Sequence, residues 1–254
     1  MKTGSLMIGS TNITDRLKNE PMALNQTTHK TILIRILKEI YANLEIGPWL
    51  GFKGGTAAYL FYGLERFSVD LDFDLLSPEK EDVVFDEVKG ILEKFGVIKI
   101  ADKKRFSLIF ILAYADKEID AQNVKVEINK RDFGSKYEIK SFLGIPIKVM
   151  VREDMIANKL VALYERIGKT NRDVYDSWFF LSKGWAINNA IIEKRTALSF
   201  QDFLSGCIEV VRKLSSSHML SGMGELLTEK QKVWVKNKLK DELIFQLELL
   251  LNSQ

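Results

Sequence analysis

The sequence has only one cysteine, Cys207, and two histidines, His29 and His218, among its 254 residues. A single cysteine cannot close a disulfide within the chain or supply a cysteine-rich zinc site. The two histidines lie far apart in ordinary sequence contexts, which argues against a histidine-based catalytic triad or metal site. Any reaction chemistry therefore has to come from other residue types.

Long apolar runs are also absent. No segment is long and apolar enough to span a bilayer, and the polar stretch 1–26 lacks the apolar core of a signal peptide. We therefore expect a cytoplasmic protein without a membrane partner. The net charge of +3 permits a polyanionic partner but does not require one, because local patches decide nucleic-acid binding.

The composition, with 46% hydrophobic and 28% charged residues, is typical of a globular protein of one large domain or two lobes. Up to about Asn25 no period is evident. A short strand is expected at 49–53, ending at Gly54 and Gly55, and Thr56 is placed to cap the helix that follows. The other expected elements of this half are helices at 28–44 and 81–95 and strands at 69–73, 96–100, 106–113, 124–129 and 142–149.

After residue 151 the pattern is helical for the rest of the chain. The main expected helices are 152–167, 172–181, 199–214 and 228–251. We therefore predict an α+β fold with an α/β lobe over residues 1–150, which carries an N-terminal helix, and a helical lobe over 151–254.

Aspartates alternate with apolar residues over 69–74, so that a strand here places Asp70, Asp72 and Asp74 on one face. Two acids spaced in this way can share a magnesium ion, which prefers carboxylate oxygens, water and substrate phosphates. A third acid is expected from a neighbouring strand, and Glu127 is the candidate because it faces away from its apolar neighbours. Two metals about 4 Å apart could then activate a hydroxyl and stabilise a leaving pyrophosphate.

Taken singly, an Asp-x-Asp is commonly solvated surface and a Gly-Gly-Thr is commonly a turn. The combination is more informative. Glycines at a helix start let the backbone approach a triphosphate, and the helix N-terminus offers N–H groups to it. Gly54, Gly55 and Thr56 followed by Asp70 and Asp72 therefore form a coherent phosphate-and-metal pattern.

This pattern resembles the first motif of the DNA polymerase β-like nucleotidyltransferase superfamily. The longer strings at 53–57 and 62–73 resemble the AbiEii-type toxins of type IV toxin–antitoxin systems, most specifically over 50–76 and in total over roughly 30–181. The resemblance implies a nucleotidyltransferase-like mixed-sheet lobe followed by a helical lobe. It also implies that the two aspartates bind Mg²⁺ and that the hydroxyl after the glycines contacts the nucleotide.

A second group of polar residues opens the helical half. Lys159 and Arg166 are seven residues apart and therefore share a helix face, and Asp173 begins the next helix. On their own these residues are typical of surface ion pairs. The resemblance implies more: Lys159 would contact the triphosphate, and Asp173 would support catalysis or nucleotide binding. Arg166 would neutralise phosphate or hold Asp173.

The reaction that the resemblance implies is transfer of a nucleoside monophosphate from a nucleoside triphosphate (NTP) to an RNA hydroxyl such as the tRNA 3′ end, with a cognate antitoxin as partner. Basic clusters at 99–105, 125–131 and 230–240 could hold RNA. They are interleaved with acids, however, as solvated faces commonly are. Alternative acceptors are a protein hydroxyl or a small molecule such as an aminoglycoside. A non-catalytic nucleotide-binding interaction module is disfavoured because the glycine turn, both aspartates and Lys159 are all present.

Overall fold

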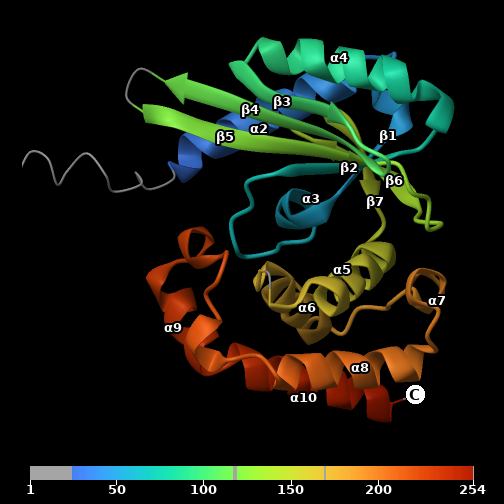
Figure 1. Ribbon diagram of the computed structural model, residues 1–254, viewed down its shortest axis with the longest axis vertical. Coiled ribbons are helices and arrows are strands. Elements are labelled where there is room, and N and C mark those ends of the chain that lie inside the picture. Colours follow the sequence, from blue (N-terminus) through green and yellow to red (C-terminus); the bar gives the residue numbers. More distant parts are fainter. Residues whose placement is uncertain (1–24, 117–118, 169, 254) are drawn as a thin grey trace, which may run out of the picture.

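The computed structural model describes residues 25–116, 119–168 and 170–253 (Figure 1). Its centre is a seven-stranded sheet in the order β3-β4-β5-β2-β1-β7-β6. The strands are β1 (Leu50–Lys53), β2 (Leu71–Leu75), β3 (Val97–Lys103), β4 (Ser107–Asp116), β5 (Ile119–Asn129), β6 (Tyr137–Phe142) and β7 (Ile145–Met150). The pairs β2–β5 and β1–β7 are parallel and the others antiparallel, which confirms the predicted α+β class with a mixed sheet.

Helices surround and follow this sheet. They are α2 (Gln26–Ala42), α3 (Gly54–Phe61), α4 (Glu81–Glu93), α5 (Arg152–Arg166), α6 (Arg172–Ser182), α7 (Asn189–Thr196), α8 (Phe200–Arg212), α9 (Glu229–Asn237) and α10 (Leu239–Asn252). Short 3-10 turns lie at Gly47–Trp49, Pro78–Lys80, Ser216–His218 and Gly224–Leu226. Among the described residues, no helix combines the length and apolar character needed to cross a membrane. The stretch before Asn25, where no period is predicted, lies outside the described residues.

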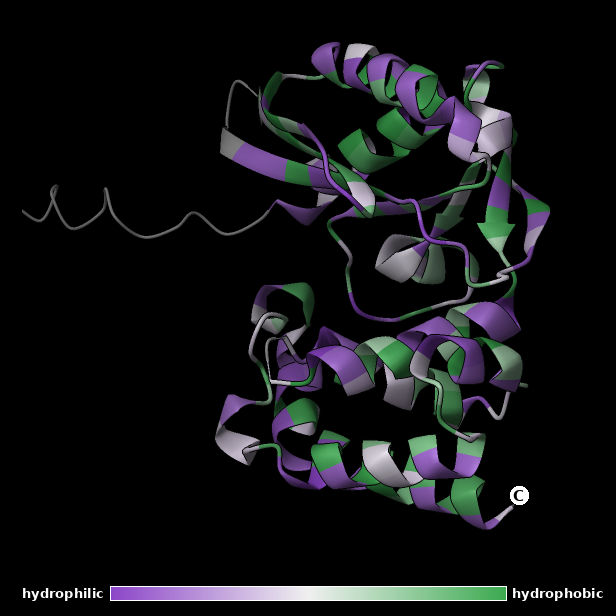
Figure 2. Cartoon of the chain, turned by 45° about the vertical axis from the view of Figure 1, so that its right-hand side comes forward, coloured by the Kyte–Doolittle hydropathy of each residue, from purple (hydrophilic) through white to green (hydrophobic). Residues whose placement is uncertain are grey.

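The elements form layers (Figure 1). Helices α2 and α4 cover one face of the sheet, and α3 lies on the other face between the sheet and α5. Helices α8 and α10 form the layer farthest from the sheet, beyond α5 and α6. Figure 2 shows hydrophobic and polar residues interleaved along the strands and helices, as expected for elements with one buried and one exposed side.

Nearly all of the buried apolar side chains, from Leu33 of α2 to Leu247 of α10, belong to one hydrophobic cluster. Strand β7 ends at Met150, and α5 begins at Arg152. The division of the chain into two lobes near residue 150 stays a prediction.

Several predicted elements are wrong in detail. The segment predicted as one strand at 142–149 contains a turn at Leu143 and Gly144, with φ of 51° and 79°, and only its part from Ile145 belongs to β7. The preceding strand β6 ends at Phe142 and is not predicted. The helix predicted at 228–251 breaks at Lys238, whose φ of −131° is not helical, into α9 and α10. Helix α7 is not among the predicted elements.

Candidate active site

The turn from β1 into α3 forms one wall of the site. Gly54 has a φ of +79°, a region that favours glycine, and a Cβ added there would overlap the carboxylate of Asp72. Only glycine therefore allows Asp72 to lie directly against this turn. The sequence prediction of a glycine turn at the end of a strand and the start of a helix is confirmed.

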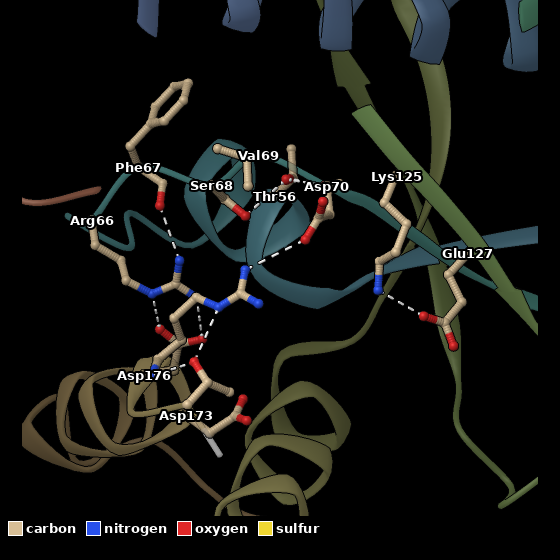
Figure 3. A network of polar contacts seen from close by, with 12 residues as sticks. Thr56, Arg66, Phe67, Ser68, Val69, Asp70, Lys125, Glu127, Asp173 and Asp176 are labelled. Carbon is tan, nitrogen blue, oxygen red and sulfur yellow. Dashed lines mark hydrogen bonds and ion pairs between the residues drawn. The ribbon is translucent and has the colours of Figure 1, made fainter. Parts of the chain in front are cut away.

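Thr56 has a different place from the one predicted. Helix α3 begins at Gly54, so the prediction that Thr56 caps the helix is wrong. Its buried hydroxyl donates to the backbone carbonyl of Asp70 and contacts Ser68 Oγ at 3.0 Å (Figure 3). Thr56 thus ties α3 to the segment that carries Asp70.

Three carboxylates meet on neighbouring strands. The parallel register of β2 and β5 sets Asp72 opposite Glu127, as the sequence predicts for adjacent strands, and Asp70 immediately precedes β2. Burial raises the pKa of Asp72, and the charges of Asp70 and Glu127 raise it further, although Lys125 opposes the shift. These acids therefore form a site where positive charge is favoured.

Cations already lie beside these acids. Lys125 Nζ is 2.8 Å from a carboxylate oxygen of Glu127, and Arg172 reaches Asp70 at 3.4 Å. Burial lowers the pKa of Lys125, but Asp72 and Glu127 outweigh burial and raise it above its ordinary value. The pair between Lys125 and Glu127 is visible in Figure 3. Arg172 is a site residue that the sequence analysis did not select.

The donor chemistry of the three acids suits a hard divalent cation, which prefers carboxylate oxygens. Over the residues that the structure describes, no three Asp, Glu, His or Cys side chains already converge as a metal-binding group. Asp70, Asp72 and Glu127 nevertheless border the same cavity, and glycine at position 54 leaves space for Asp72 beside it. The residues present therefore fit a metal ion that completes its coordination with substrate phosphates.

The opposite wall carries cations from the helical half. Lys159 of α5 lies 2.7 Å from Asp176 and 3.4 Å from Asp173, and its side chain is 12% exposed. Arg166, two turns further along α5, pairs with Asp173 at 2.9 Å. The predicted shared face of Lys159 and Arg166 is therefore observed, and both side chains contact the same aspartate.

Arg66 completes this network from the other half of the chain. Its Nε and one terminal nitrogen donate to the two carboxylate oxygens of Asp176, at 2.6 and 2.7 Å (Figure 3). Burial opposes ionisation of Asp176, but Arg66 and Lys159 outweigh burial and lower its pKa to about 2. Sequence reasoning did not identify this pair, because the two residues are far apart in the chain and no local pattern indicates that they meet.

A cavity of about 530 Å³ lies between the two walls. It brings together nearly all of the predicted site residues, the exception being Thr56, which is not among the residues lining the cavity. The predicted residues that line it are Gly54, Gly55, Asp70, Asp72, Glu127, Lys159, Arg166 and Asp173. Asp70, Asp72 and Glu127, which we call the acidic group, thus face Lys159 and Arg166 across a cavity large enough for a nucleotide.

Asp74, the third aspartate of the strand, is committed to a structural network. Its carboxylate lies 2.5 Å from Lys53 Nζ, accepts a hydrogen bond from Asn129 Nδ2 at 2.6 Å and accepts another from the hydroxyl of Tyr137. Burial and the Asp74 charge raise the pKa of Tyr137. This network fixes the ends of β2 and β5 next to the cavity.

Comparison with solved structures finds the same fold in bacterial proteins. JHP933 from Helicobacter pylori superposes with a TM-score of 0.57 at 22% sequence identity, covering 90% of this chain and 95% of that chain. MenT4, a nucleotidyltransferase toxin from Mycobacterium tuberculosis, superposes with a TM-score of 0.61 at 19% identity, covering 89% and 85%. At these identities the likeness shows the fold.

Comparison of sequences is more specific. The profile of a family described as "Nucleotidyl transferase AbiEii toxin, Type IV TA system" matches residues 35–233. The match runs well past residue 181, where the resemblance seen in the sequence motifs fades, and it includes all of α8. No curated protein sequence matches the chain.

Proposed function

This chain belongs to the AbiEii family of nucleotidyltransferase toxins of type IV toxin–antitoxin systems, and we propose that it uses Mg²⁺ and NTP to nucleotidylate the 3′ end of a tRNA. The observation that carries the proposal is the cavity in which Asp70, Asp72 and Glu127 face Lys159 and Arg166. The acids suit a metal ion bound to the triphosphate of the substrate, and the cations suit the negative charge of the pyrophosphate that leaves. A tRNA acceptor places the reaction in the cytoplasm.

The triphosphate lies against the glycine turn. Gly54 and Gly55 let the backbone approach the phosphates at the N-terminus of α3, whose N–H groups attract anions. Asp70, Asp72 and Glu127 would hold Mg²⁺, which when bound lowers the pKa of the attacking hydroxyl and neutralises phosphate charge. Thr56 acts as a positioning residue, because its hydroxyl holds the backbone of Asp70.

In the reaction, the 3′ hydroxyl oxygen of the acceptor forms a bond to the α-phosphorus. The bond from that phosphorus to the pyrophosphate oxygen breaks, and the hydroxyl proton passes to solvent. Negative charge grows on the leaving pyrophosphate, and Lys159 and Arg166 lie on the wall of the cavity where they can stabilise it. Asp173 holds both cations in place.

The direct test is incorporation of label from each α-³²P-labelled NTP, with Mg²⁺ and total tRNA. The wild-type protein is compared with Asp70→Ala/Asp72→Ala, and with Asp102→Ala as a control in which an exposed acid on β3 is removed. We expect label on tRNA with the wild type and the control and no label with the double variant. Thermal unfolding of all three proteins checks that they are folded.

Other outcomes would overturn the choice of acceptor. Label on protein would identify a protein hydroxyl as the acceptor. Label on neither protein nor RNA would favour a small molecule such as an aminoglycoside. A growth defect that persists in the double variant would favour a binding module without catalysis.

A further inference from the structure

Arginine and phenylalanine side chains alternate in an unbroken row beside the cavity. Arg105 lies 4.8 Å from the ring centroid of Phe106, and Arg131 lies 5.5 Å from the same ring. Arg131 also lies 5.4 Å from the ring of Phe133, and Arg195 lies 4.8 Å from that ring. We refer to these five residues as the arginine–phenylalanine ladder.

The ladder runs from the protein surface into the cavity. Its outer end is open to solvent, since Arg105 is exposed and the side chain of Phe106 is 48% exposed. Its inner members, Arg131, Phe133 and Arg195, line the cavity, and the side chain of Arg195 is only 12% exposed. The ladder also joins the two sides of the cavity, because Arg195 belongs to α7 and the other four residues lie just before β4 or just after β5.

Hydrogen bonds fix the inner end relative to the acidic strands. Arg131 Nε donates to Asn129 Oδ1 at 3.2 Å, and Asn129 lies two residues beyond Glu127 on the same face of β5. At about 3.3 Å per residue, this places Asn129 roughly 7 Å along the strand from Glu127. The ladder therefore begins within one or two nucleotide lengths of the acidic group.

Arg195 is held rigidly and still has a free donor. Its terminal nitrogens donate to Asn158 Oδ1 at 2.7 Å and to Glu165 at 3.0 Å. Its Nε is buried and has no hydrogen-bond partner within the described part of the chain. The guanidinium lies at the cavity wall, where its positive charge favours an anionic group such as a phosphate.

Folding stability does not account for the outer half of the ladder. Cation–π pairs at exposed sites stabilise a protein only slightly, and a half-exposed phenylalanine between two guanidinium groups keeps apolar surface in water. Aromatic rings interleaved with arginines are, in contrast, the usual composition of sites for single-stranded nucleic acid. Bases stack on rings and on guanidinium planes there, and the cations neutralise phosphates.

We propose that the arginine–phenylalanine ladder binds the single-stranded end of the RNA acceptor and guides its terminal hydroxyl to the acidic group. The inference rests on the proposed RNA acceptor. A base packs on the exposed part of Phe106, while Arg131 and Arg195 contact the backbone near the reacting end. The nucleoside triphosphate occupies the glycine-turn side of the cavity and does not use the ladder.

The test measures RNA binding without catalysis. Fluorescence anisotropy gives the Kd of a labelled 12-nucleotide single-stranded RNA for the wild type and for Phe106→Leu/Arg131→Gln. The control is Phe245→Leu/Lys213→Gln, which removes an exposed ring from α10 and an exposed cation directly after α8, outside the basic clusters named above. NTP binding is followed separately as the rise in Tm on adding nucleotide and Mg²⁺.

We expect the ladder variant to raise the Kd for RNA at least about tenfold, with the nucleotide-induced rise in Tm unchanged, and the control to stay within about twofold of wild type. An unchanged Kd, or no RNA binding by the wild type, would overturn the proposal. A loss of the nucleotide response with RNA binding intact would also overturn it and assign the ladder to the nucleotide. If tRNA is never labelled but the ladder variant still loses RNA affinity, the proposed acceptor is wrong and the ladder stands as an RNA site.

Discussion

Arg66 and Asp176 form a bidentate ion pair that connects the loop before β2 to helix α6. The two side chains are 2% and 0% exposed, and they are 110 positions apart in the chain. Asp176 also forms an ion pair with Lys159, with 2.7 Å between Lys159 Nζ and the carboxylate. The cation that faces the cavity is therefore positioned by a pair buried behind it.

Removing Arg66 should destabilise the fold strongly. In Arg66→Met, Asp176 keeps only Lys159 as a charged partner, and breaking a buried pair from one side typically costs about 3 kcal/mol or more. The matched control is Arg212→Met, which breaks the exposed pair with Glu248 and should cost under about 1 kcal/mol. Urea unfolding measures both. Equal losses in the two variants would show that the buried pair has no special weight.

The same pair should make stability depend on pH in acid. The pKa of Asp176 is lowered to about 2 in the folded protein, against about 3.9 in an unfolded chain. Its contribution is therefore complete above about pH 5 and is lost as the pH falls through 4 toward about 1, in total about 3 kcal/mol. The measurement is the difference in unfolding free energy between wild type and Asp176→Asn.

That difference should be level between pH 5 and 7 and should be smaller by about 1 kcal/mol at pH 3. A difference that stays constant down to pH 3 would mean that Asp176 is not ionised preferentially in the folded state.

Local sequence patterns predicted the strand that carries the acidic residues well, but not the residues that surround it. Alternation of apolar and acidic residues predicted that Asp70 and Asp72 share a face, and adjacent strands bring Glu127 beside them. The pair of Arg66 and Asp176 has no local signal, because hydrophobic periodicity reports which face of an element is buried and not which distant residue meets it.

The predicted elements failed where the pattern was weak. Strand β6 lies at the sheet edge, and its alternation of apolar and charged residues covers only 137–140 before it stops at Ser141. The break at Lys238 separates two helices whose apolar residues continue across it. Gly144 marks the turn after β6, whereas no glycine or proline marks the break at Lys238.

Substitution of Gly54 should damage the site more than the fold. In Gly54→Ala the new methyl group has to displace the Asp72 carboxylate, and the positive φ adds strain. Gly63→Ala is a matched control, since Gly63 has a φ of +72° but no atom within 4 Å of an added Cβ. We expect both variants to lose about 1 kcal/mol of stability from the backbone strain, with a further loss in Gly54→Ala.

Nucleotide transfer separates the two glycine variants. Gly54→Ala should lose transfer activity at least about a hundredfold, because small displacements of groups at the reacting centre are costly, whereas Gly63→Ala should keep it. Equal activity in the two variants would show that contact between the glycine turn and Asp72 is not needed.

Asp72→Asn tests the metal site without an activity assay. Burial raises the pKa of Asp72, so its charged form is disfavoured in the protein without metal. Replacing the carboxylate by an amide should therefore leave Tm unchanged or raise it.

In the wild type, Mg²⁺ at about ten times its Kd should raise Tm by about 3 °C through binding to the folded state. The variant should lack this rise, and Asp102→Asn, an exposed change on β3, should keep it. An equal Mg²⁺ response in Asp72→Asn and the wild type would place the metal elsewhere, and a large fall in Tm without Mg²⁺ would show that Asp72 serves the fold instead.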